Sequence, residues 1–136
     1  KSELIKYIKE NKLSSKIKII PFQKNPYKYL VHSDIFLFSS IFEGLPNVLL
    51  EAQCLKKFII STDCPTGPRE ILLNGKAGDI VPMFNYKKMS QRINNYKKTK
   101  PIYLQKINIG YNNLARFDYN YNMKMYLKIV KKFIYL

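Results

Sequence analysis

The chain has 136 residues, with 24 Lys and Arg against nine Asp and Glu, a formal net charge of +15 and 46% hydrophobic residues. This length and composition indicate one globular domain with a substantial core and exclude a disordered chain. No apolar run reaches the roughly 18 residues of a membrane-spanning helix, and no signal-peptide pattern is found. Cys54 and Cys64 lack metal-ligand spacing, so we expect reduced thiols, Cys54 inside a buried helix and Cys64 in a loop.

The excess of positive charge is compatible with several partners. It would attract nucleic acid, anionic lipid headgroups or the phosphates of a nucleotide. A Lys-, Asn- and Ile-rich composition that merely covers a solvated surface explains the same charge. Most of the basic residues lie in predicted helices outside the motif described below, where no base-reading pattern appears.

Helical and extended patterns alternate through the first part of the chain. In order, we predict a helix over residues 2–12, a strand over 16–20, a helix over 26–31, a buried strand over 34–38, a helix over 47–55, a strand over 57–61, a helix over 69–73 and a strand over 79–81. Alternating strands and helices favour parallel pairing through crossovers, with the loops after the strands gathered at one edge. The predicted fold class is therefore α/β, a Rossmann-like doubly wound parallel sheet.

The second part of the chain is predicted to be helical. Residues 85–98 form a helix candidate, residues 100–117 a helix interrupted at Gly110, and residues 121–135 a basic amphipathic helix. We therefore expect a single domain, residues 1–136, with an α/β core over 1–82 and a helical tail over 83–136. The chain begins at Lys1 inside a helical pattern, from which we expect it to be a piece of a longer protein.

The most informative stretch is SSIFEGLPNVLLEA, residues 39–52. It follows a predicted strand, turns at Gly-Leu-Pro-Asn and enters a helix that begins within a residue of Pro46 or Asn47. Because this helix is apolar nearly all round, we expect it to be buried, which leaves Glu51 with little water and in need of a partner. A strand, loop and helix in this order place a helix N-terminus, which binds phosphate, beyond the strand end.

Glu43 and Glu51, with seven residues between them, resemble the E-x7-E signature of retaining GT-B glycosyltransferases of family 4 (group 1). The segment STDCPTGPREIL, residues 61–72, resembles the next strand and loop of the same C-terminal donor-binding domain, of the bacterial surface-polysaccharide type. The resemblance implies transfer of a sugar, with retention and without a metal, from a UDP-linked or other nucleotide-sugar donor to a glycan or lipid-linked acceptor. It also implies a cytoplasmic enzyme, peripheral to the inner membrane, that needs no cofactor.

The resemblance assigns roles to particular residues. Glu43 would meet hydroxyls of the donor sugar as the catalytic residue, and Glu51 would accept hydrogen bonds from the ribose. The other expected donor-binding residues are Ser40, the turn and helix start at Gly44, Leu45, Pro46, Asn47 and Val48, the nucleobase loop at Phe22 and Gln23, and Arg69. The acceptor-binding N-terminal domain and the phosphate-binding Arg and Lys of the family are expected outside this sequence, so the fragment alone should be inactive.

Structural alternatives exist for several of these assignments. Glu43 could pair with Arg69 and Glu51 could cap a nearby amide, while Phe22 could belong to the core. Ser40 could be a simple turn cap, and Arg69 could form a surface ion pair. Two other functions also stay open. The chain could be a truncated, non-catalytic remnant of such an enzyme, or a basic domain that binds any polyanion. The sequence predicts no specific nucleic-acid partner, because it lacks a helix-turn-helix, an RNA-recognition signature and a zinc site.

Overall fold

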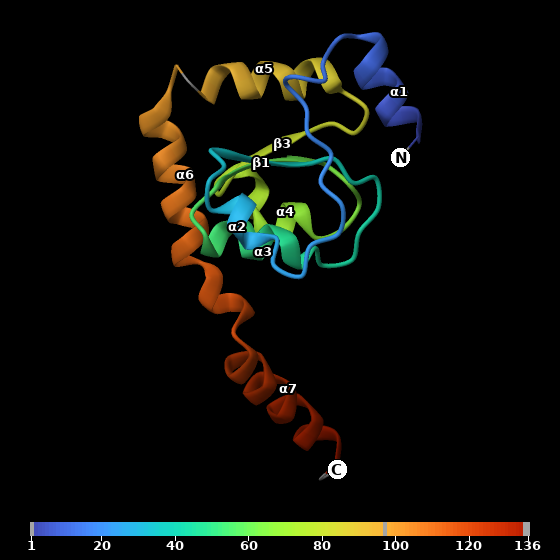
Figure 1. Cartoon of the computed structure of the whole chain (residues 1–136). Helices are drawn as coiled ribbons and strands as arrows, with labels where there is room; N and C mark the ends of the chain where they lie inside the picture. The colour runs from blue at the N-terminus through green and yellow to red at the C-terminus, as the bar shows by residue number, and fades with distance from the viewer. Residues whose placement is uncertain (1, 97, 135–136) are drawn as a thin grey trace.

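The computed structural model describes residues 2–96 and 98–134 (Figure 1). Its elements are α1 (Ser2–Glu10), α2 (Tyr27–Leu30), β1 (Ile35–Phe38), α3 (Asn47–Cys54), β2 (Phe58–Thr62), α4 (Pro68–Ile71), the 3-10 turn η1 (Leu73–Gly75), β3 (Asp79–Val81), α5 (Tyr86–Tyr96), α6 (Lys100–Asn112), the 3-10 turn η2 (Leu114–Phe117) and α7 (Tyr119–Ile134). The predicted α/β class and the helical tail are confirmed.

The three strands form a parallel sheet in chain order, β1-β2-β3. Ile35 pairs with Phe58 and Ile60 pairs with Asp79 across the two ladders. Every residue of β2 is buried, because this strand has a neighbour on each side and helices over both faces. As expected for parallel strands, the loops that follow all three lie at one edge of the sheet.

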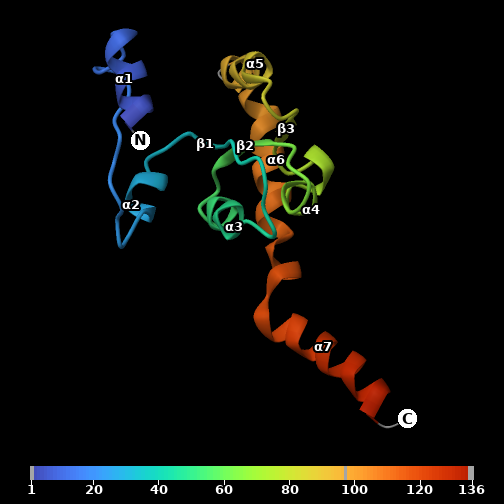
Figure 2. The ribbon, with the colours of Figure 1, turned by 90° about the vertical axis from the view of Figure 1, so that its right-hand side faces the viewer.

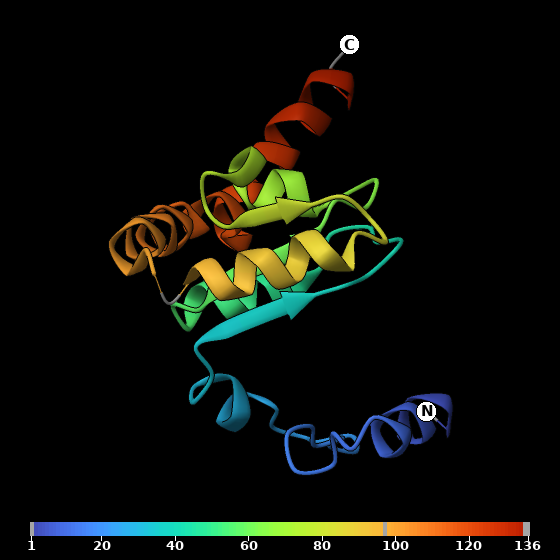
Figure 3. The same ribbon diagram turned by 90° about the horizontal axis from the view of Figure 1, so that it is seen from above.

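Figure 3 shows from above that helices lie over both faces of the sheet. Alternate side chains of each strand face these opposite helix layers. Ile59 packs with Leu49 and Ala52 of α3 and with Ile71 at the end of α4. On the other face, Phe58 and Ile60 pack with Tyr103 and Ile107 of α6, and Met89 and Ile93 of α5 cover the same cluster. The sheet is thus the middle of three layers.

Two strand predictions need correction. Residue 16 ends a turn, and residues 17–20 have no ladder partner in the described structure, so the predicted strand does not form. An isolated extended segment gains no interstrand hydrogen bonds, and in Figure 2 this segment lies apart from the sheet. The strand predicted as buried, β1, is instead at the edge of the described sheet, where Leu37 is 45% exposed.

The motif helix α3 is also less buried than its sequence predicts. Leu49, Ala52 and Gln53 are buried, whereas Glu51 is half-buried and Cys54 is exposed. One side of α3 packs on the sheet, and its apolar residues elsewhere are only partly covered. The prediction for the two thiols is therefore wrong for Cys54. Cys64 does lie in a loop, but it is buried there, and burial raises the pKa of its thiol.

The interruption predicted at Gly110 is absent, because α6 runs through it. Gly110 is buried against α3, and a Cβ placed there would lie 2.7 Å from Nε2 of Gln53. The glycine thus permits a close helix approach instead of ending a helix. The last predicted helix corresponds to α7, although its predicted final residue, 135, lies outside the described residues.

Candidate functional site

The loop that contains Glu43 is held by side-chain hydrogen bonds at the carboxyl ends of β1 and β2. Ser40 Oγ donates to the Glu43 carboxylate at 2.6 Å, and Thr62 Oγ1 donates to the Ser40 carbonyl at 2.5 Å. Thr66 Oγ1 donates to the Glu43 carbonyl. Both the backbone and the carboxylate of Glu43 are therefore positioned by residues of the strand-end loops.

A close backbone approach fixes the turn that follows Glu43. Gly67 has φ +87°, and a Cβ added to it would lie 2.6 Å from the Gly44 carbonyl oxygen and in conflict with the Pro46 ring. Only glycine fits there at low cost. A Cβ at Gly44 itself would meet nothing within 4 Å, so the backbone of Gly44 borders open space.

The helix start lies where the sequence predicts it. Pro46 directly precedes α3, its carbonyl accepts the first helical bond from the Leu49 amide at 2.9 Å, and Asn47 is the first helical residue. Leu45 and Asn47 are exposed, whereas Pro46 is buried. The N-terminus of α3 therefore faces the same open edge of the sheet as the Glu43 loop. Its backbone amides and partial positive charge suit an anionic group.

A cavity of about 390 Å³ lies between α2, β1 and α3, within the size range of small-ligand sites. Three predicted donor-binding residues line it, Gln23, Val48 and Glu51. Tyr27 of α2 stands near Glu51, and this carboxylate raises the pKa of the Tyr27 phenol above its ordinary value. The cavity, called the Glu51 cavity below, therefore combines an apolar wall with one carboxylate.

The loop at the mouth of this cavity is organised by Gln23. Its Nε2 donates to the Phe22 carbonyl at 3.1 Å, and its Oε1 accepts from the Tyr29 hydroxyl at 3.4 Å. Phe22 is 91% exposed and does not line the cavity. The alternative that placed Phe22 in the core is therefore wrong.

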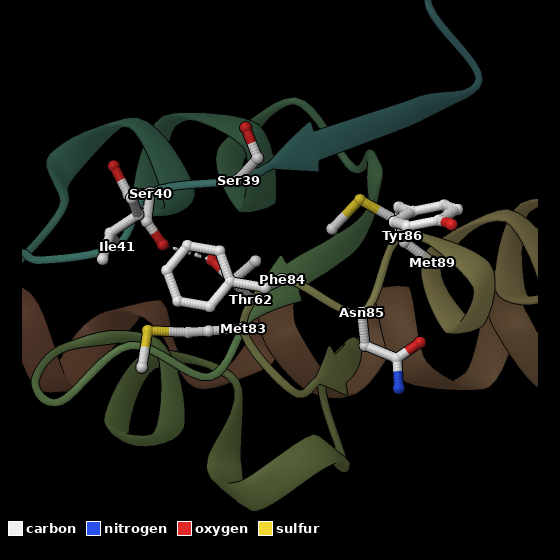
Figure 4. Close-up of a pocket in the computed structure, with 9 residues that line it drawn as sticks. All are labelled: Ser39, Ser40, Ile41, Thr62, Met83, Phe84, Asn85, Tyr86 and Met89. Atoms are coloured by element: carbon white, nitrogen blue, oxygen red, sulfur yellow. Dashed lines mark hydrogen bonds between the residues drawn. The ribbon is translucent and has the colours of Figure 1, made fainter.

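A second cavity of about 370 Å³ opens on the other side of the strand ends. Figure 4 shows its lining, with Phe84 beside Thr62 and the hydrogen bond from Thr62 to Ser40 drawn as a dashed line. Ser40 thus borders this cavity and also holds Glu43. Phe84 is 74% exposed, and its backbone has the left-handed φ of +61°.

Arg69 pairs with Asp63 and not with Glu43, the partner considered from the sequence. Its guanidinium makes two hydrogen bonds to the Asp63 carboxylate, at 2.7 and 2.5 Å, which raise the pKa of Arg69. The pairing of Glu43 with Arg69 is therefore wrong, since Glu43 accepts from Ser40. Arg69 lines neither cavity. Its hydrogen bonds to Asp63 instead hold the loop that follows β2.

Sequence reasoning did not single out Thr62, Tyr27 or Phe84. Thr62 is the last residue of β2, and its position at a strand end was the available signal. Tyr27 precedes Glu51 by 24 positions, so only the packing of α2 beside α3 could reveal the pair. Among residues 2–96 and 98–134, no group of three or more His, Cys, Asp or Glu side chains is arranged to hold a metal ion.

Comparisons with known proteins identify the family and the fold of the chain. Residues 1–113 match the family of glycosyl transferases group 1. An uncharacterized glycosyltransferase of Methanocaldococcus jannaschii is 50% identical over 72 residues, which cover 53% of this chain and 18% of that protein. An N-acetylgalactosaminyltransferase of Campylobacter jejuni, whose name specifies a diphospho-undecaprenol-linked substrate, is 37% identical over 91 residues, 67% of this chain and 25% of that protein. The matched part thus spans a quarter or less of these relatives.

Solved structures show the same fold. A glycosyltransferase from Rickettsia africae matches 98% of this chain and 36% of its own with a TM-score of 0.86 at 23% identity. Anabaena HepE, solved in complex with UDP, matches 99% of this chain and 36% of its own with a TM-score of 0.82 at 17% identity. The fold is therefore that of the C-terminal domain of GT-B glycosyltransferases.

Proposed function

Because this chain belongs to the group 1 glycosyltransferase family, we propose that residues 1–136 are the donor-binding domain of an enzyme that transfers a sugar from a nucleotide-sugar. The observation that carries the proposal is the Glu51 cavity, where Gln23 of the N-terminal segment meets Val48 and Glu51 of α3 although it lies far from them in the chain. The α/β core over residues 1–82 supplies the donor site, and residues 83–136 form the helical tail.

In this proposal the nucleoside occupies the Glu51 cavity. An ionised carboxylate accepts two hydroxyl donors, which suits the paired hydroxyls of a ribose. The backbone of the loop at Phe22 and Gln23 holds the base at the mouth of the cavity. The UDP bound by Anabaena HepE, a protein of the same fold, favours uridine diphosphate as the nucleotide.

The diphosphate and the sugar then lie at the Glu43 loop. The N-terminus of α3 faces the diphosphate and stabilises its charge as it leaves, while open space at Gly44 allows a close approach. Glu43, oriented by Ser40, accepts hydrogen bonds from sugar hydroxyls as the oxocarbenium-like transition state forms. Membership of family 4, retention of anomeric configuration and independence of a metal rest on the E-x7-E resemblance and are part of the proposal.

The acceptor is proposed to be a glycan or a lipid-linked saccharide. The support is the Campylobacter relative, whose name specifies a diphospho-undecaprenol-linked substrate. Such an enzyme would act in the cytoplasm at the inner membrane. None of the described helices is long and apolar enough to cross a membrane. We place the acceptor-binding part of the protein outside these 136 residues, so this chain alone should bind the donor weakly and transfer no sugar.

Calorimetry with uridine and guanosine diphosphates at moderate salt tests the donor site. We expect saturable binding of one nucleotide, weakened roughly 10- to 100-fold in Glu51→Ala, because a charge-assisted hydrogen bond contributes about 1.5–3 kcal/mol. Glu70→Ala is the matched control, since Glu70 is an exposed glutamate that lines neither cavity. This control should bind like the unmodified chain.

Two other results would reject the proposal. Binding that ignores both the base and Glu51, and fades as salt increases, would favour the polyanion-binding alternative. Absence of binding in a folded chain would contradict a donor site within these residues and favour the non-catalytic remnant.

A further inference from the structure

The short helix α2 joins the loop at the mouth of the Glu51 cavity to β1, and contacts at both of its ends hold it. Leu30 of α2 packs against the buried cluster between the sheet and α3. Lys57 Nζ donates to the Val31 carbonyl at 2.6 Å, where α2 ends. At the other end, the Asn25 side chain accepts from the Tyr27 amide at 3.1 Å. The side chains of α2 therefore have defined positions beside α3.

The carboxylate of Glu51 has one evident partner in this cavity, the phenol of Tyr27. Glu51 is half-buried, so its carboxylate needs an opposite charge or a hydrogen-bond donor. Within residues 2–96 and 98–134, no ion pair to Glu51 is present. The charge of Glu51, partial burial and a hydrogen bond to Glu51 raise the pKa of the Tyr27 phenol. The phenol therefore stays protonated at neutral pH and donates to the carboxylate.

We propose that Tyr27 is a positioning residue for Glu51, which it orients so that the carboxylate meets both hydroxyls of the donor's ribose. This inference rests on the proposed function, in which Glu51 accepts hydrogen bonds from the ribose. A glutamate side chain has several rotatable bonds, and acceptance from two neighbouring hydroxyls needs one orientation of its carboxylate. A carboxylate that is already oriented loses less conformational entropy when the nucleotide binds.

The hydrogen-bonding capacity of a carboxylate allows Tyr27 and the ribose to be bound together. Its two oxygens offer about four lone-pair sites. One site accepts from the Tyr27 phenol, and the others are free for the two ribose hydroxyls. Tyr27 therefore supports the bound state and does not compete with the ribose for Glu51.

The second tyrosine of α2 contacts a different part of the candidate site. The Tyr29 hydroxyl donates to Gln23 Oε1 at 3.4 Å, and Gln23 Nε2 donates to the carbonyls of Pro21 and Phe22 at 3.3 and 3.1 Å. Both tyrosines lie on α2 and line the same cavity, and each loses one hydroxyl when it is changed to Phe. Tyr29→Phe is therefore a matched control for Tyr27→Phe.

Calorimetry with uridine diphosphate and 2′-deoxyuridine diphosphate tests the role of Tyr27, with the guanosine pair used if the chain selects that base. We expect the 136-residue chain to prefer the ribonucleotide about tenfold, because the deoxy compound leaves part of the Glu51 carboxylate without a donor. Tyr27→Phe keeps the ring and should reduce this preference to about twofold. Tyr29→Phe should keep the full preference, whatever its affinity for the two nucleotides.

The effect of Tyr27→Phe should also depend on Glu51. In a chain that carries Glu51→Ala, Tyr27→Phe should change the affinity for uridine diphosphate by less than about twofold, because a positioning residue acts through the group that it positions. A loss as large as in the unmodified chain would show that Tyr27 acts without Glu51 and would overturn the proposal. An unchanged ribose preference or tighter binding in Tyr27→Phe, or an equal loss of preference in Tyr29→Phe, would also overturn it.

The two proposals fail in different ways. Nucleotide binding that Glu51→Ala weakens, with an unchanged ribose preference in Tyr27→Phe, would overturn the role of Tyr27 alone. Absence of saturable nucleotide binding would overturn the proposed function, and the role of Tyr27 with it.

Discussion

The three-stranded sheet with the helices packed on its two faces, called the body below, and the helix α7 are built from similar residues. They are stabilised in different ways. In the body, Phe58 is fully buried, stacks on Tyr96 with ring centroids 5.3 Å apart and meets Tyr103 edge-to-face at 4.3 Å. In α7, Phe133 is 74% exposed. A periodic apolar pattern thus predicts which side of a helix or strand avoids water. It does not predict whether the same chain provides the cover.

The largest effect should come from the body. Phe58→Ala removes a ring from the layer between β2, α5 and α6 and should lower the free energy of unfolding by about 3–5 kcal/mol. Phe133→Ala should change it by less than about 0.5 kcal/mol, because an exposed side chain contributes little to folding. Urea unfolding followed by circular dichroism measures both, and equal losses would contradict the distinction between the two regions.

The second largest loss of folding stability should come from changing a buried charge. Asp79 on β3 is 4% exposed, accepts from Lys106 Nζ at 2.5 Å and lies 3.7 Å from Arg92 Nε. Asp79→Asn should cost about 2–3 kcal/mol, below the full value for a buried pair because Lys106 and Arg92 retain some contact with water.

Glu70→Gln serves as the surface control for Asp79→Asn in the same urea titration. The carboxylate of Glu70 is exposed, so its loss should leave the unfolding midpoint unchanged. If Asp79→Asn were as stable as the unmodified chain, the three-residue charge cluster would not connect β3 to α5 and α6.

The smallest effect should be confined to α7. Asp118 Oδ1 accepts from the Tyr121 amide at 2.8 Å and caps the helix. Asp118→Ala should lower local helix stability by about 1 kcal/mol. Hydrogen exchange should then quicken in α7 while the amides of β2 keep their protection. Faster exchange throughout the sheet would show that α7 and the body unfold together.

Much of the body could be predicted from the sequence. Apolar runs bounded by turn residues identified β1, β2 and β3, and the Gly-Leu-Pro turn located the start of α3 within one residue. These features depend on local chemistry. The failures at residues 16–20, Leu37 and Gly110 depend on neighbours that lie far away in the chain, because burial and strand pairing are set by tertiary contacts.

The candidate site shows the same division. The sequence placed Glu43 and Glu51 on a loop and a helix, and their positions there are as expected. It could not show that Ser40 donates a hydrogen bond to the Glu43 carboxylate or that Arg69 donates to Asp63. Nor could it show that Tyr27 lies beside Glu51. The roles of these residues in binding a donor remain predictions for the Glu51→Ala experiment.

The strand order β1-β2-β3 also bears on how the chain folds. Ile35 meets Phe58 and Ile60 meets Asp79, so each crossover closes a segment of about 20 residues, for which the loop-closure entropy is modest. Short closures of this kind favour fast folding among parallel sheets. Pairing of the three strands therefore needs only residues 35–81, and the cover of their second face comes from α5 and α6, so α7 contributes to neither step.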